Sequence, residues 1–430
     1  MKKQNSLRFN LALVPLLAGL LAQNAPGSGF AIYETSARGL AMGNADSARA
    51  ADASTLYTNP AAMTSLKGTQ VTFGATAIMP DMRVTNYGTP TGDQITPLNN
   101  YTAVAPNFYV THALTNRLSI GFAEFTQYGL KSTFPENWPG TVNNYYTDIV
   151  SFTLNPNIAY KLIEKNGQSL SLAAGLQVMY FDVTISKSFP SAGTPVPSAL
   201  TDLTRRIVLE GDNIGYGWNL ALQYELNRKF AIGLTYRSEV KQDLDEATAD
   251  VPGYMVGDYT PGARHTGVPA SGKIVLPKSA SIGATYTPNE KWLVAAQALW
   301  TGWSSFDALN IYIDGTLYPS EKKWSDTWRY SIGVEHYYNE FITLRGGFVW
   351  DCDPVPAAHA DFLVPSNDRR IYSLGIGLNF TPNFHVDFSY AVIFIDSRTI
   401  EARPADGIPY KARIDKGHAN IVSLSANWKF

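Results

Sequence analysis

The feature that most constrains the fold of this chain is an alternation of apolar and polar residues, which recurs from about residue 71 to the C-terminus. Successive side chains of a β-strand point to opposite faces, so a period of two predicts strands with one apolar and one polar face. The pattern occupies segments 342–350, 372–380 and 385–394. The last strand shows it most clearly, with Val422, Leu424, Ala426, Trp428 and Phe430 on one face and Ser423, Ser425, Asn427 and Lys429 on the other.

The connections between these segments alternate between short and long, which predicts how the strands are arranged. Short polar turns on one side and long loops on the other are typical of outer-membrane barrels, because only a closed barrel pairs every strand backbone in lipid. The sequence therefore predicts an all-β, transmembrane antiparallel β-barrel of about fourteen strands with both ends on the periplasmic side. Short turns are expected at 115–117, 163–168, 227–229, 288–291, 339–340 and 381–383, and long loops at 80–100, 131–146, 188–204, 245–270, 314–326, 353–368 and 396–415.

The composition agrees with a membrane barrel. Charged residues make up 16% of the chain, against about a quarter in soluble proteins. The net charge of -2 provides no attraction for a polyanion, so no nucleic-acid partner is expected. A soluble β-sandwich would also alternate and stays open at this point. Aromatic residues gather near expected strand ends and suit interfacial belts; examples are Trp300 with Trp303, Trp324 with Trp328, Tyr337 with Tyr338, and Phe348 with Trp350.

The N-terminus has the pattern of a secretory signal peptide. Three basic residues lie within the first eight, and an apolar run at 11–22 and small residues follow. This run is shorter than the ~20 residues of a spanning helix. We expect residues 1–27 to be removed by cleavage before Ser28, although a buried N-terminal helix is an alternative.

Residues 28–66 differ from the rest of the chain. They are rich in Ala, Ser, Gly and Asp and have too few large apolar residues to form a core alone. Near their end, Asn59 is suited to cap a helix start and Pro60 to occupy its first position, followed by Ala61. We therefore expect this segment to be held by the larger structure.

No catalytic or metal-binding motif stands out. The chain contains neither G-x-S-x-G nor H-E-x-x-H, its six His residues are scattered, and Cys352 is its one cysteine. The sequence therefore predicts no enzyme activity, no metal, no cofactor and no disulfide. An embedded lipid hydrolase, a general porin and a surface adhesin remain alternative functions.

Several N-terminal motifs and the C-terminus resemble the long-chain fatty acid transporter family of the Gram-negative outer membrane, which includes the aromatic-hydrocarbon uptake porins. The terminal Phe430, with Trp428 on the same face, resembles the signal that the barrel assembly machinery reads. The N-terminal matches are Ser28-Gly29-Phe30, the small-residue run at 39–45, Asp52-Ala53-Ser54 and Asn59-Pro60-Ala61.

This resemblance implies a hatch at residues 28–67 that closes the lumen of a barrel at 68–430, and a monomeric protein. In the family, hydrophobic ligand enters through the long loops and leaves laterally into the membrane at a kinked third strand. Here that strand would be 118–130, with Tyr128, Gly129 and Leu130 at the kink. Glycine suits a bent or bulged strand.

The ligand is either a long-chain fatty acid or a neutral aromatic or aliphatic hydrocarbon. A fatty acid would need a basic residue near its carboxylate. Strand alternation predicts that Arg237, Lys241 and Arg345 face the lumen and could contact it.

Overall fold

The computed structural model describes residues 29–189, 205–415 and 417–430. The predicted signal peptide, residues 1–27, lies outside these residues. None of the helices in the described part is long and apolar enough to cross a membrane.

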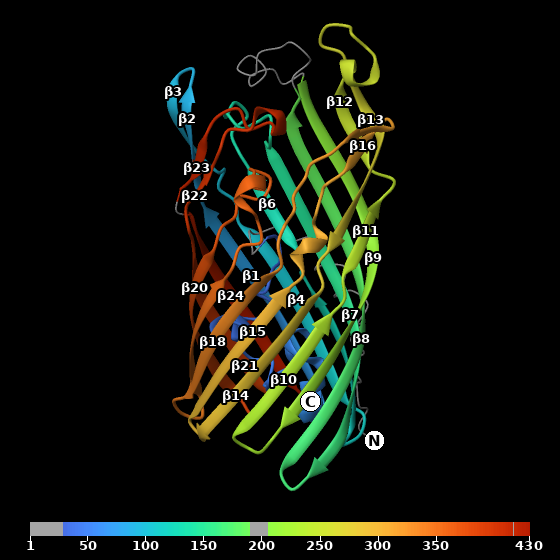
Figure 1. Cartoon of the computed structure of the whole chain (residues 1–430). Coiled ribbons are helices and arrows are strands. Elements are labelled where there is room, and N and C mark those ends of the chain that lie inside the picture. Colours follow the sequence, from blue (N-terminus) through green and yellow to red (C-terminus); the bar gives the residue numbers. More distant parts are fainter. Residues whose placement is uncertain (1–28, 190–204, 416) are drawn as a thin grey trace, which may run out of the picture.

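The wall is one closed antiparallel sheet in which β1 pairs with β24 on one side and with β4 on the other. The predicted all-β barrel of fourteen strands is confirmed (Figure 1). In order around the wall, the strands are β1 (Thr69–Asp81), β4 (Ala103–Ala113), β5 (Leu118–Phe125) with β6 (Gly129–Thr133), β7 (Tyr146–Lys165), β8 (Gln168–Ser188), β9 (Arg206–Glu225), β10 (Phe230–Arg237) with β11 (Val240–Leu244), β14 (Ser279–Asn289), β15 (Trp292–Thr301), β18 (Thr327–Tyr337), β19 (Ile342–Asp351), β20 (Arg369–Thr381), β21 (Phe384–Ile395) and β24 (Gly417–Lys429).

The six predicted short turns are present at one end of the barrel, and the long connections lie at the other end (Figure 1). Four of the predicted loops contain paired strands, which the sequence analysis missed. Their polar residues and turn formers concealed pairing that continues beyond the apolar part of the wall. Four of these extra strands form a separate sheet: β2 (Arg83–Thr89), β3 (Gly92–Pro97), β22 (Arg398–Ile400) and β23 (Ala412–Ile414). The others extend the wall: β12 (Thr248–Pro252) with β13 (Arg264–Leu276), and β16 (Ile311–Ile313) with β17 (Thr316–Tyr318).

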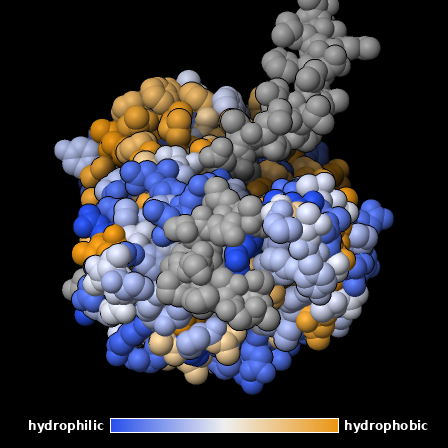
Figure 2. Space-filling view, turned by 90° about the horizontal axis from the view of Figure 1, so that it is seen from above, coloured by the Kyte–Doolittle hydropathy of each residue, from blue (hydrophilic) through white to orange (hydrophobic). Residues whose placement is uncertain are grey.

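The wall is apolar outside and polar inside. On β24, Leu424 is 55% exposed, whereas the neighbouring Ser423 and Ser425 are buried. Leu374 on β20 is likewise exposed and Ser373 is buried. A soluble sandwich would bury the apolar face instead, so this arrangement excludes that alternative. Viewed from the loop end, hydrophilic residues cover much of the surface and hydrophobic residues gather at the perimeter (Figure 2).

The N-terminal segment, residues 29–66, lies inside the barrel (Figure 1). It contains α2 (Ala37–Ala41), α3 (Thr55–Thr58) and the 3₁₀ helix η2 (Pro60–Ser65). Helix α2 contacts β19, β20, β21, β24 and β1, and η2 contacts β5, β7, β8 and β9. The segment therefore touches the wall on opposite sides of the lumen, and most of its residues are buried.

Glycine lets the segment approach the wall closely. A Cβ atom added to Gly347 on β19 would lie 2.4 Å from the backbone nitrogen of Gly43 and 2.6 Å from the backbone carbon of Met42. Such distances exclude any larger residue unless the segment moves. The neighbouring Gly346 faces the other way, and its nearest atom would be 3.8 Å from an added Cβ.

We predict that Gly347→Ala displaces the N-terminal segment, whereas Gly346→Ala does not. Overpacking of a tight contact typically costs about 1–3 kcal/mol. Hydrogen exchange of residues 36–46 measures the displacement, and exchange should accelerate only in Gly347→Ala. Equal exchange in the two variants would contradict the close contact.

Candidate functional site

Asn59 fixes the N-terminal segment to the wall. Its Oδ1 accepts a hydrogen bond from the backbone N–H of Ala61 at 3.0 Å, and Pro60 occupies the first helical position of η2, as the sequence predicts for a cap. Its Nδ2 lies 2.7 Å from the carbonyl oxygen of Ser47 and 3.1 Å from that of Leu222 on β9. The sequence did not reveal this second set of bonds, because they join residues far apart in the chain.

The side chain of Asn59 is fully buried, so its hydrogen bonds have no replacement from bulk water. Asn59→Asp retains the Oδ1 cap but loses both donors and places a charge against two carbonyl oxygens. We predict that it loosens the segment by about 1–3 kcal/mol, the cost of leaving buried polar groups unsatisfied.

Single-channel recordings check this prediction. Asn59→Asp should show brief channel openings that the parent protein lacks. Asn59→Ala should show them as well, because it loses both the Oδ1 cap of η2 and the Nδ2 hydrogen-bond donors. Thr91→Ala, in the outer hairpin between β2 and β3, is the control and should not open. An Asn59→Asp protein as closed as the parent would refute the assignment.

The third strand of the wall is interrupted. β5 ends at Phe125 and β6 begins at Gly129. β5 pairs with β4 from Ser119 to Phe125, but within the described residues no pairing joins β6 to β4. β6 keeps its pairing with β7 on the other side. On this edge of β6, the carbonyl of Thr133 accepts from the backbone N–H of Asn99 at 2.9 Å, and that of Lys131 accepts from the Tyr101 hydroxyl. Residues 127–129 therefore lie where β4 gives no ladder pairing, and the predicted kink residues begin at this interruption.

The N-terminal segment supplies the missing partner. The backbone N–H of Ile32 donates to the carbonyl of Gln127, and that of Gly129 donates to the carbonyl of Phe30, both at 2.9 Å. Ala31 and Tyr128 thereby form an antiparallel bridge. Movement of residues 30–32 away from the wall must break these two bonds, while Tyr128 keeps its bonds to Ser151 on β7.

The predicted kink residues have separate contacts. Tyr128 reaches across the lumen, where its hydroxyl donates to the carbonyl of Pro277 at 3.0 Å. Gly129 is the first residue of β6, and its backbone N–H donates to the carbonyl of Phe30. The side chain of Leu130 is buried in the large apolar cluster described next.

An aromatic cluster surrounds Phe30 at this point. Its ring centroid lies 4.9 Å from that of Trp303, 5.7 Å from that of Phe306 and 5.9 Å from those of Trp324 and Tyr128. The prediction that Trp303 and Trp324 belong to an interfacial belt is wrong, because both are buried in the lumen. Their partners in sequence, Trp300 and Trp328, lie on the wall strands β15 and β18, and Trp328 is exposed.

A second aromatic cluster lies beyond the first toward the loops. The rings of Phe134 and Trp138 stack at 3.9 Å, and Phe362 meets Trp138 edge-on at 4.8 Å. All three side chains are buried. Both clusters belong to one continuous apolar core.

A buried ion pair joins the two aromatic clusters. Lys322, two residues before Trp324, binds Asp361, next to Phe362, and the Lys322 side chain is 3% exposed. Lys187 on β8 interacts electrostatically with both groups. The buried Lys322–Asp361 pair therefore lies in the electrostatic field of a second basic residue. The sequence analysis missed this group because its members lie in three distant segments.

Arg237 faces the lumen, as strand alternation predicts. Its guanidinium donates to the carbonyl of Tyr57 at 2.8 Å and to the side chains of Asn155 and Gln177 at 3.3 Å. Within the described part of the chain it has no carboxylate partner. The adjoining cavity, which Tyr128 also lines, has a volume of about 50 Å³, enough for one or two waters at ~30 Å³ each.

Arg345 also faces the lumen but is already paired. It binds Glu335 and Asp387, both at 2.6 Å. The expectation for Lys241 is wrong: its side chain is 58% exposed, and the neighbouring Gln242 is buried instead. The interruption between β10 and β11 at residues 238–239 shifts the alternation by one residue.

The fold and this site define a class of protein: an outer-membrane barrel whose lumen holds its own N-terminal segment. A family model described as outer membrane protein transport protein (OMPP1/FadL/TodX) matches residues 18–430, and the chain belongs to this family. It is an outer-membrane protein, and the predicted family resemblance is confirmed.

Curated relatives match over nearly their entire length. The long-chain fatty acid transport protein of Escherichia coli O6:H1 is 27% identical over 449 residues, covering 98% of this chain and 99% of the relative. Outer membrane protein P1 of Haemophilus influenzae is 26% identical over 471 residues, covering 98% and 100%.

Solved structures share the fold. A Pseudomonas aeruginosa FadL homologue superimposes with a TM-score of 0.78 at 21% identity, covering 94% of this chain and 100% of that structure. The Pseudomonas putida toluene transporter TodX gives a TM-score of 0.67 at 17% identity, covering 91% and 97%.

Proposed function

We propose that this protein carries out passive uptake of long-chain fatty acids across the outer membrane and releases them laterally into the bilayer at the third strand. The observation that carries this proposal is the interruption of the third strand between β5 and β6, where the N-terminal segment bonds to residues 127 and 129 beside a buried apolar core. Relatives named as long-chain fatty acid transport proteins support the substrate class.

The chemistry of the lumen explains why such a route is needed. The inner wall is lined by polar residues such as Ser423 and Ser425, which attract no hydrocarbon chain. Each methylene gains roughly 0.8 kcal/mol when it leaves water, so the aromatic core around Phe30 is a favourable first stop. The break at residues 126–128 lies directly beside this core, because Tyr128 packs against Phe30.

The Lys322 group favours an anionic ligand. Lys322 lies two residues from Trp324 and its partner Asp361 lies next to Phe362, so a buried ammonium group adjoins the aromatic clusters, and Lys187 interacts electrostatically with the pair. A fatty acid bound here would place its carboxylate beside the Lys322 ammonium group and its hydrocarbon chain in the apolar core. Neutral aromatic or aliphatic hydrocarbon uptake is the second candidate, because ring stacking in the aromatic clusters needs no charge, and a toluene transporter shares the fold.

The remaining functions are less consistent with the filled lumen. An open general porin requires a continuous aqueous path, whereas residues 29–66 occupy this one. We propose no catalytic role and no adhesion role for the chain. Nor do we propose a resident cofactor for transport.

The C-terminus suits the assembly role that its sequence predicts. Phe430 is 76% exposed, and its backbone closes the barrel by bonding to Thr69 at 2.8 Å and 3.2 Å. Trp428 also faces outward. We propose that these two aromatic residues are recognised by the barrel assembly machinery, that residues 1–27 are cleaved during export, and that the protein is a monomer.

We predict that Lys322→Met weakens oleate binding at least tenfold and leaves toluene binding unchanged, because only the carboxylate needs the ammonium group. Asp361→Asn should strengthen oleate binding, since it frees Lys322. Lys323→Met is the control, because Lys323 is exposed and paired with Glu321. Ligand titration of the purified protein checks all three.

If Lys322→Met and Asp361→Asn both bind oleate as the parent does, the anionic substrate is rejected. Strong toluene binding in the same samples would then favour hydrocarbon uptake.

A second prediction concerns the exit. Gly129→Leu places a bulky side chain at the break and should slow fatty acid uptake by cells several-fold without weakening binding to the purified protein. Gly346→Leu, on the outer face of β19, adds the same bulk elsewhere and should have no effect. Parental uptake rates in Gly129→Leu would count against lateral release.

A further inference from the structure

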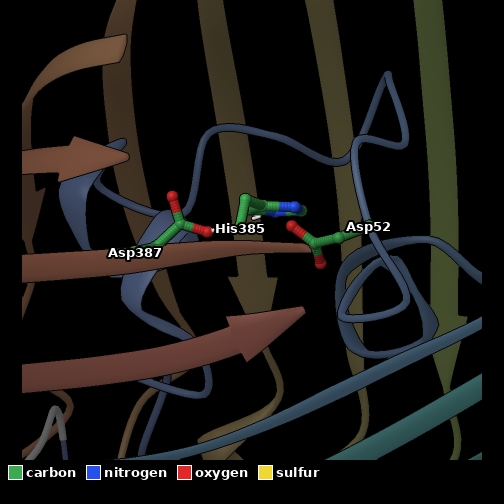
Figure 3. Close-up of side chains that lie close together, drawn as sticks. All are labelled: Asp52, His385 and Asp387. Carbon is green, nitrogen blue, oxygen red and sulfur yellow. Dashed lines mark ion pairs between the residues drawn. The ribbon is translucent and has the colours of Figure 1, made fainter. Parts of the chain in front are cut away.

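Three metal-ligating side chains meet between the N-terminal segment and the wall, away from the apolar core. Asp52 comes from the turn before α3, and His385 and Asp387 are two residues apart on the inner face of β21 (Figure 3). One ligand atom from each lies within 4.8 Å of the others, and His385 Nε2 is 3.6 Å from Asp387 Oδ2.

Hydrogen bonds from neighbouring residues orient each of the two carboxylates. Asp52 Oδ1 accepts a hydrogen bond from the backbone N–H of Ser54 at 2.8 Å. Asp387 Oδ1 accepts from Arg345 at 2.6 Å, and its Oδ2 accepts from Asn427 at 3.0 Å. Such supporting bonds orient metal ligands and fix their charge.

The second oxygen of Asp52 points to a missing partner. Asp52 is 3% exposed, yet among the described residues Oδ2 has neither a hydrogen-bond donor nor an ion pair. The carboxylate faces the His385 ring (Figure 3). A cation at this point would give Oδ2 the partner that the described protein residues do not supply.

Of the four carboxylates near this point, Asp52 is the one without an ion pair among the described residues. Two guanidinium groups, Arg38 and Arg345, pair with Asp46, Glu335 and Asp387, and Asp52 is left over. Two further basic residues, Lys429 and Arg49, line the adjoining cavity. The Arg49 guanidinium donates to Thr287 instead, and neither residue forms an ion pair with the three ligands in the described structure.

We propose that Asp52, His385 and Asp387 bind a divalent transition-metal ion of the zinc class, which latches the N-terminal segment to β21. An imidazole with two carboxylates is a donor set that suits Zn²⁺, whereas Ca²⁺ and Mg²⁺ prefer oxygen ligands alone. Zinc–ligand bonds of ~2.0–2.2 Å place tetrahedral donors about 3.4 Å apart. The His385–Asp387 separation already fits, and a small inward movement brings Asp52 into range.

The remaining coordination position opens on solvent. The adjoining cavity, lined by His385, Arg345 and Glu335, has a volume of about 240 Å³ and accommodates water as the fourth ligand. Because Asp52 is the one ligand from the N-terminal segment, the ion would connect that segment to the wall.

The test uses the full mature protein, stripped with EDTA and titrated with ZnCl₂ by calorimetry. We expect one equivalent to bind, at least tenfold tighter than Ca²⁺ or Mg²⁺. Asp52→Asn keeps the acceptor for Ser54 N–H but removes the charged ligand, and His385→Gln removes the imidazole. Each should weaken Zn²⁺ binding at least tenfold, whereas His112→Gln, an exposed histidine on β4, should not.

Hydrogen exchange of residues 46–54 tests the latch. Zn²⁺ should slow exchange at least tenfold in the parent and in His112→Gln, and have no effect in Asp52→Asn. Absence of saturable Zn²⁺ binding, or equal affinity in all four proteins, overturns the site. Binding without altered exchange overturns the latch. Neither result depends on the uptake proposal, which ligand binding and cell uptake test separately.

Discussion

The structure depends on one constraint: in a bilayer, every backbone N–H and C=O of the wall needs a partner within the protein. Antiparallel pairing meets this need around almost the entire barrel, and β24 with β1 closes it. Among the described strands, the edge of β6 is an exception, because β4 pairs only with β5 on that side and the segment before β4 bonds to the far end of β6 through Asn99 and Tyr101. The N-terminal residues Phe30 and Ile32 supply hydrogen bonds near the start of β6 instead.

This substitution connects the lumen to the wall. The same segment inserts Phe30 among the aromatic rings, bonds to residues 127 and 129, and continues to Asn59, which is fixed to β9. A ligand that competes with Phe30 for the aromatic core would therefore disturb the bonds at the break. At the other end of the lumen, Arg38 joins the segment to Glu335 at 3.2 Å, so the segment can loosen near Phe30 while it stays anchored elsewhere.

The sequence was sufficient for the features that repeat or that are local. Alternation predicted the wall and its polar lumen, turn lengths predicted the strand number, and Asn59-Pro60 predicted a cap. The prediction from alternation failed where a short interruption changes which residues of a strand face the lumen. At residues 238–239 such an interruption turns Lys241 outward. The sequence also could not separate Trp303 from Trp300, because both suit a strand end and only tertiary packing buries one of them.

Residues that meet across the lumen were hidden for the same reason. Lys322 and Asp361 come from different loops, and Asp52 and His385 are more than three hundred positions apart. Single-sequence periodicity contains no information about which loops meet. The assignment of Arg345 to the lumen was right, but its pairing with Glu335 and Asp387 required the register of β18, β19 and β21.

The central claim, that bonding of the N-terminal segment to the third strand controls exit, is tested most directly by a reversible lock. Ala31 and Tyr128 form the bridge between them, so cysteines at both positions, in a Cys352→Ser background, would join the two elements by a disulfide. The account predicts that oxidation stops fatty acid uptake while ligand still binds, and that reduction restores uptake. Full uptake with the disulfide verified intact would contradict it.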